Sequence, residues 1–82
     1  MKVIDRKATM ELINRLIDGC ALSRIDIAKR LGVKPQAVYG WRYGKFPSLN
    51  NLFNLADILE KSIDDLVILD KDILRNFYHL NV

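Results

Sequence analysis

The stretch from Gln36 to Tyr43 carries hydrogen-bonding and aromatic side chains at helical spacing. On a helix that turns about 100° per residue, four of its residues fall within an arc of about 100°. They are Gln36, Tyr39, Gly40 and Tyr43. The amide of Gln36 can make paired hydrogen bonds to adenine, and Tyr39 can contact a thymine methyl group or a phosphate. This face therefore has residue types that suit reading base edges in DNA.

Gly40 is unexpected at the centre of that face, because glycine costs a helix roughly 1 kcal/mol relative to alanine. A missing side chain would let the helix backbone approach the floor or wall of a groove. The alternative is that Gly40 merely weakens a surface helix and that Tyr39 and Tyr43 are ordinary surface residues. Val38 and Trp41 fall on the opposite side, and we interpret Trp41 as a core residue rather than a platform for stacked bases.

Caps and breakers divide the chain into five short helices. Apolar residues at helical spacing predict a first helix that ends at Gly19. Ser23 and Asp26 have the form of a capping box before a second helix over residues 24–31, which Gly32 would end. Pro35 suits the first turn of a third helix over residues 35–43. Gly44 is expected to close it.

Two further helices are predicted in the carboxyl-terminal half. Ser48 caps the fourth, and Ser62 with Asp65 repeats the capping-box form before a short fifth. The predicted apolar stripe of the fourth helix is Leu49, Leu52, Phe53, Ala56 and Leu59. Because no segment alternates with the period of a strand, the predicted fold class is all-α, a compact five-helix bundle.

Only three residues, 32–34, join the second and third helices, so these two helices must cross steeply. Ala28 is small where the partner helix comes close, and Gly32 supplies the positive φ that the turn needs. This is the helix-turn-helix arrangement, in which the second helix of the pair enters the DNA major groove.

Charge is distributed unevenly along the 82 residues. Residues 1–47 hold ten Lys/Arg and four Asp/Glu, a net charge of +6, whereas residues 48–82 hold three and six, a net charge of −3. A basic half suggests that one end of the molecule meets a polyanion. The alternative is that charge simply fluctuates along a short chain.

Several classes of protein are disfavoured by the composition. The longest aliphatic run, Leu66–Leu69, is far shorter than the ~20 residues of a membrane helix. Cys20 is the single cysteine, so no internal disulfide can form, and a reduced cytoplasmic protein is expected. His79 has no neighbouring ligand and is not expected to bind metal. Without a phosphate loop or a nucleophile with its base, we expect no enzyme and no cofactor.

The run SRIDIAKRLGVKPQAVYGWRYGKFPSLNNLFNLADILEKSIDDLV, residues 23–67, resembles the phage repressor and Cro helix-turn-helix superfamily, also called the Xre type. With the first helix, the resemblance covers residues 9–68. It implies a lambda-repressor-like five-helix domain that binds double-stranded DNA, usually as a homodimer on a pseudo-palindromic operator. No small-molecule ligand is expected.

The resemblance also implies roles for individual residues. The positions that face the bases in the family are here Lys34, Gln36, Ala37, Tyr39 and Gly40. Those that hold phosphates are Arg24, Arg42, Tyr43 and Lys45, and Asn50 and Asn51 could reach another phosphate beside the free amides of the fourth helix. The sequence departs from the family at Pro35, where many relatives have a glutamine, and at Gly40. Direct readout is therefore expected to be sparse, with specificity from DNA shape or from Lys34 and Gln36.

The last segment, residues 69–82, lies outside the strong resemblance, so the DNA-binding domain is placed at residues 1–68. Asp70 is expected to cap a short sixth helix. The apolar residues here exceed the need of a small core and predict a partner surface. The alternative is a tail folded back over the same chain. The expected dimer interface consists of Ile68, Leu69, Ile73, Leu74 and Phe77.

These inferences predict a sequence-specific, Cro-like transcriptional repressor that occludes a promoter, either a complete protein or the amino-terminal piece of a longer one. The second hypothesis is an all-α interaction module, an antitoxin or adaptor whose basic half binds an acidic protein. A salt titration against random duplex DNA separates the two, because an adaptor would not bind DNA even in dilute buffer.

Overall fold

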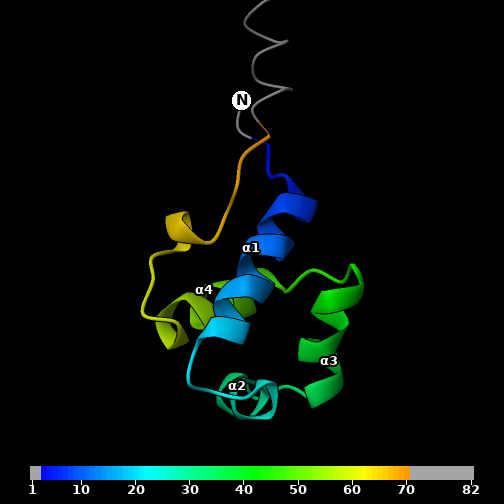
Figure 1. Cartoon of the computed structure of the whole chain (residues 1–82), viewed down its shortest axis with the longest axis vertical. Helices are drawn as coiled ribbons and strands as arrows, with labels where there is room; N and C mark the ends of the chain where they lie inside the picture. Colours follow the sequence, from blue (N-terminus) through cyan, green and yellow to red (C-terminus); the bar gives the residue numbers. More distant parts are fainter. Residues whose placement is uncertain (1–2, 71–82) are drawn as a thin grey trace, which may run out of the picture.

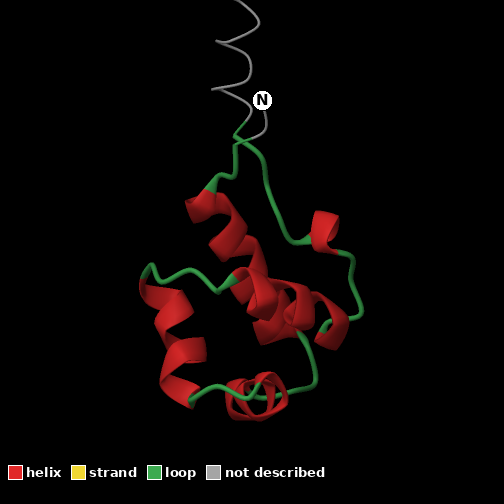
Figure 2. Ribbon diagram, turned by 180° about the vertical axis from the view of Figure 1, so that it is seen from behind, coloured by secondary structure: helices red, strands yellow, loops and turns green. Residues whose placement is uncertain are grey.

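A computed structural model describes residues 3–70 of the protein. In chain order the helices are α1 (Arg6–Gly19), α2 (Arg24–Leu31), α3 (Pro35–Gly40), the 3₁₀ helix η1 (Trp41–Tyr43), α4 (Leu49–Ile58) and the 3₁₀ helix η2 (Ile63–Asp65). In Figure 1, α3 lies to one side of α1 and α4 lies behind it. The helix α2 is at the end of the molecule distant from the amino terminus. The predicted all-α class is confirmed over the described residues, which form helices and loops in Figure 2.

The predicted caps explain where the helices begin and end. The Ser23 hydroxyl accepts from the Asp26 N–H at 3.1 Å, and the Asp26 carboxylate accepts from the Ser23 N–H at 3.1 Å. Gly32 ends α2 with φ 71°, the left-handed conformation that glycine adopts without steric cost. These contacts confirm both bounds of α2, and they set the start of the turn toward α3.

A single core fills the space between the helices. Its fully buried members include Ile13 and Ile17 of α1, Ile27 of α2, Val38 of α3 and Leu55 of α4. The helix α2 packs against both α3 and α4, while α1 packs against η1. In Figure 1 α2 is seen nearly end-on and α3 lies along the page, which is the steep crossing that the short turn predicts. Trp41 is also buried, as predicted.

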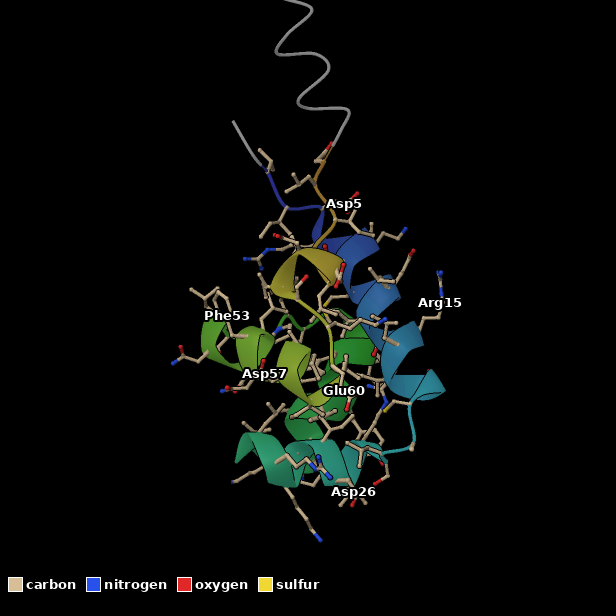
Figure 3. All side chains as sticks on the ribbon, turned by 90° about the vertical axis from the view of Figure 1, so that its left-hand side faces the viewer. Asp5, Arg15, Asp26, Phe53, Asp57 and Glu60 are labelled. Carbon is tan, nitrogen blue, oxygen red and sulfur yellow. The ribbon has the colours of Figure 1, made fainter. Side chains whose placement is uncertain are left out.

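The predicted apolar stripe of α4 is wrong at two positions. Leu49 is 67% exposed and Phe53 is 50% exposed, and the buried face of this helix consists of Leu52, Leu55 and Ala56. The error arises because residues three and four apart define two adjacent faces of one helix, and spacing does not decide which of them meets α2. Phe53 lies on the outer side of α4 in Figure 3.

The five-helix count needs a correction as well. The third predicted helix divides, because α3 ends at Gly40 and the next three residues form η1. In place of a fifth α-helix, residues 63–65 form the 3₁₀ helix η2. Its cap is the predicted one, since the Asp65 carboxylate accepts from the Ser62 N–H at 3.1 Å. The described residues thus contain four α-helices and two 3₁₀ helices.

The two ends of the described chain lie side by side. Ile4 and Leu69 form an antiparallel bridge, flanked by hydrogen bonds from the Asp5 N–H to the Ile68 carbonyl at 2.8 Å and from the Asp70 N–H to the Val3 carbonyl at 2.6 Å. We call this pairing the terminal clamp. Of the expected dimer residues, Ile68 and Leu69 belong to it, whereas Ile73, Leu74, Phe77 and the expected sixth helix lie outside the described residues.

Thr9 fastens the terminal clamp to α1. Its hydroxyl is fully buried and accepts a hydrogen bond from the Ile68 N–H at 2.9 Å.

No helix among residues 3–70 is long and apolar enough to cross a membrane.

Candidate nucleic-acid interface

The helix α3 presents a polar face outward because its apolar residues are held in the core. Val38 is fully buried and Trp41 is 3% exposed, so the positions between them turn away from the core. Lys34, Gln36 and Tyr39 are exposed, and Ala37 is half-buried. Four of the five expected base-contacting residues thus have side chains on or at the edge of the α3 surface, while the fifth is Gly40.

Gly40 is covered by a neighbouring side chain. A Cβ placed on Gly40 would lie 2.9 Å from Cδ of Lys45, and the Lys45 N–H donates to the Gly40 carbonyl at 3.2 Å. The backbone of Gly40 is ordinary helix, with φ −60° and ψ −23°. The missing side chain therefore makes room for the aliphatic stem of Lys45. This is a different reason for glycine from the bare, groove-facing surface that the helical wheel indicated.

Arg24, expected on DNA phosphate, lies inside the protein. Its side chain is 5% exposed, and Nη1 donates to the Val38 carbonyl of α3 at 3.1 Å. Nη2 donates to the Asn14 Oδ1 at 2.9 Å and to the Asp18 Oδ1 at 3.1 Å. These contacts tie α2 to α1 and α3. We therefore leave Arg24 out of the proposed DNA contacts.

Asn14 is a second polar support for the recognition helix, and sequence reasoning missed it. Its Nδ2 donates to the Trp41 carbonyl at 3.0 Å and to the Met10 carbonyl at 2.8 Å. A short helix leaves its last carbonyls without partners, and here Arg24 and Asn14 supply donors to the end of α3 and to η1. The available signal was a polar residue beside the buried Ile13 and Ile17, in the middle of an amphipathic helix.

Arg42, another expected phosphate contact, is held by Asp18 on the surface. Its Nη2 lies 2.8 Å from the Asp18 Oδ1, and both side chains are about half exposed. The hydrogen bond from Arg24 holds the pKa of Asp18 below its usual 3.8, and the charge of Arg42 acts in the same direction. Asp18 is therefore an anion shared by one buried and one exposed guanidinium.

The remaining expected phosphate contacts lie on the chain that follows. Tyr43 is 84% exposed at the end of η1, and Lys45 is exposed in the loop after it. The helix α4 begins with Ser48, whose hydroxyl accepts from the Asn51 N–H at 3.2 Å. Asn50 is exposed and Asn51 half-buried in the first turn of α4, where free N–H groups favour an anion.

An open groove of about 900 Å³ is lined by residues of α1, η1 and the loop that follows. It adjoins the residues just described, since Arg42 and Tyr43 form one wall. Arg6 extends from α1 toward the loop after η1, with its guanidinium carbon 5.0 Å from the ring centre of Phe46. No cluster of three or more metal-ligating side chains occurs within residues 3–70.

These features define a helix-turn-helix protein: two steeply crossed helices joined by a tight glycine turn, with an exposed polar face on the second. The family model described as "Helix-turn-helix" matches residues 13–66. The chain therefore belongs to the helix-turn-helix family of the Xre and lambda-repressor type, which confirms the resemblance seen in the sequence.

A solved structure with a similar fold is the solution structure of the SOS-response transcriptional repressor LexA from Eubacterium rectale. The two chains are 28% identical with a TM-score of 0.69, and the match covers 77% of this chain and 68% of that one. No curated protein matches the chain closely enough to count as a relative.

Proposed function

We propose that this protein is a sequence-specific regulator of transcription that binds double-stranded DNA and represses by occluding a promoter, as a Cro-type repressor does. Its family and its similarity to a transcriptional repressor support DNA-binding regulation. The observation that carries the proposal is the outward polar face of α3, with Val38 and Trp41 locked in the core behind it. Such a helix can enter the major groove without disturbing its own packing.

Base reading is assigned to α3 and phosphate binding to the residues around it. Lys34, Gln36 and Tyr39 are the proposed base contacts, with Ala37 and Gly40 close to the groove. The proposed phosphate contacts are Arg42, Tyr43, Lys45, Asn50 and Asn51. Because few long side chains lie on α3, DNA shape is expected to contribute to specificity.

Selection of bound sequences from a random duplex pool tests this function and supplies an operator. Gln36→Ala is then expected to relax preference at one base pair, at a cost of about 1–3 kcal/mol there. Lys45→Gln is expected to weaken binding to all sequences and to lower the salt slope by about one. Equal loss on every sequence for Gln36→Ala would show that α3 is not the reader. A wild-type protein that binds no duplex in dilute buffer would instead favour the interaction-module hypothesis.

We also propose that the protein acts as a homodimer on a pseudo-palindromic operator. One recognition helix reads too few base pairs to single out a site, and a two-fold axis would place two copies about 34 Å apart. The proposed interface is the carboxyl-terminal segment, with Ile68 and Leu69 continued by Ile73, Leu74 and Phe77. Sedimentation of a chain ending at Asp70 is expected to show weaker self-association together with lower operator affinity. Unchanged dimerisation would place the interface elsewhere.

A further inference from the structure

We propose that the groove between α1 and η1 binds the DNA phosphate backbone, with Lys7 and Arg15 as phosphate contacts beyond the helix-turn-helix unit. The proposal rests on the proposed DNA-binding function and extends its footprint onto α1. It assigns a role to a basic surface that lies outside the recognition helix and its flanking loop.

Charge on the groove favours a polyanion. Four cations line it, Arg6, Lys7, Arg15 and Arg42, against the two carboxylates of Glu11 and Asp18. Asp18 already accepts from two guanidinium groups, so much of its charge is compensated within the protein. The effective field in the groove is therefore positive, and a chain of phosphates is complementary to it.

Lys7 and Arg15 are the cations available to such a ligand. Both are exposed, and they share one row of α1 with Glu11, because the three residues follow at four-residue intervals. Within residues 3–70 neither cation takes part in an ion pair, whereas Arg42 is paired with Asp18 and Arg6 lies over Phe46. Figure 3 shows Arg15 extending from α1 on the side of the molecule away from Phe53 and Asp57.

The groove is continuous with the proposed interface. Its wall opposite α1 includes Arg42 and Tyr43, which are proposed phosphate contacts at the end of the recognition helix. A DNA backbone that contacts Arg42 and Tyr43 therefore also lies next to the groove. Its next phosphates can then be reached from Lys7 and Arg15, whose long side chains keep their charged ends in solvent.

The test compares salt dependence of binding between matched variants of the full chain. Binding of a random duplex is measured from low to high salt for the wild type, for Lys7→Gln with Arg15→Gln, and for Lys61→Gln. Each lost phosphate contact lowers the slope of log K against log salt by about 0.9, so the double variant is expected to lose nearly two. Lys61 does not line the groove but a second cavity near the end of α4, which Arg15 also borders, and its variant is expected to keep the wild-type slope within a few tenths.

A further variant, Glu11→Gln, removes a negative charge from the groove and is expected to change DNA affinity in the opposite direction. Removing a carboxylate from the groove is expected to strengthen binding to every sequence, without changing base preference. Thermal unfolding of each variant checks that the fold is intact, since surface substitutions of this kind shift stability little. A slope for the double variant equal to that of Lys61→Gln overturns the proposal, while wild-type protein that binds no DNA overturns the underlying function instead.

Discussion

Arg24 and Val38 are joined across the helix-turn-helix by a hydrogen bond of 3.1 Å between the buried guanidinium and the last part of the recognition helix. The positive charge lies near the carboxyl-terminal end of α3, which is the favourable end of the helix dipole for a cation. The orientation of α3 therefore depends on a polar contact from α2 as well as on apolar packing.

Replacing Arg24 by methionine is expected to lower the free energy of unfolding by about 2 kcal/mol, since hydrogen bonds to charged groups contribute about 1.5–3 kcal/mol each. The loss is moderated because the Arg24 Nε is buried without a partner among the described residues, and methionine removes that unsatisfied group. Denaturant unfolding measures the change. Lys29→Met, an exposed cation of the same helix, is the control and is expected to change stability little.

The same variant, Arg24→Met, distinguishes a role of Arg24 in positioning α3 from a role in binding a DNA phosphate. If Arg24 only positions α3, Arg24→Met keeps the wild-type salt slope of DNA binding at a temperature where both proteins are folded. A slope lowered by about one, with stability unchanged, would restore Arg24 to the phosphate contacts.

Acid is expected to weaken the fold partly through Asp18. The hydrogen bond from Arg24 lowers the folded-state pKa of Asp18 below 3.8, so the ionised carboxylate stabilises the folded protein above pH 3.8. That contribution disappears as the pH falls from 3.8 through the lower folded-state value. Urea midpoints measured between pH 7 and pH 2.5 are expected to fall less steeply for Asp18→Asn than for the wild type. Asp57→Asn is the control, because the Asp57 carboxylate makes no hydrogen bond or ion pair with the other described residues. Parallel curves for Asp18→Asn and the wild type would contradict the assignment.

Glu60→Gly is expected to stabilise the protein by about 0.5–1 kcal/mol. Glu60 has φ 56°, a left-handed conformation that costs a non-glycine residue roughly 1 kcal/mol or more. It follows the end of α4, where the Glu60 N–H donates to Asp57 and the Lys61 N–H donates to Ala56, the pattern that normally takes glycine. Thermal unfolding checks the gain. Glu60→Ala keeps a Cβ at the strained position, so an equal gain from alanine would rule out relief of backbone strain.

Gly40→Ala is expected to be neutral or stabilising by less than 1 kcal/mol. Alanine fits the helical backbone of Gly40 and improves helix propensity by roughly 1 kcal/mol, but its Cβ must displace the stem of Lys45. With Lys45 shortened to alanine, the same change is expected to give the full propensity gain. A double-mutant cycle in urea measures this coupling. Zero coupling would mean that Lys45 does not depend on the space above Gly40.

Much of the fold follows from local signals that are complete within a few residues. Ser23, Asp26 and Gly32 specify both ends of α2 through contacts to their own neighbours, and Pro35 begins α3. Such contacts need no knowledge of the rest of the chain, which explains why the helix-turn-helix was predicted correctly.

The features that local sequence signals did not indicate depend on distant partners. Arg24 begins a helix, where a cation usually lies in solvent, and its burial depends on Asn14 and Asp18 from α1. Leu55 and Phe53 have similar hydrophobicity, and only the position of α2 decides which of them is buried. The Lys45 side chain lies over Gly40 because of the conformation of the loop after η1, which helical spacing does not describe.

The terminal clamp affects the order in which the protein opens. Its hydrogen bonds join residues as far apart as Val3 and Asp70, 67 positions along the chain, whereas the contacts between α2 and α3 span a short turn. Closing so long a loop costs more chain entropy than closing a tight turn, and the paired segments are short, with Ile4 exposed. In hydrogen-exchange experiments the Asp5 and Ile68 amides should therefore exchange before those of Ile27 and Ala28. The ends can separate in this way while α2 and α3 stay folded.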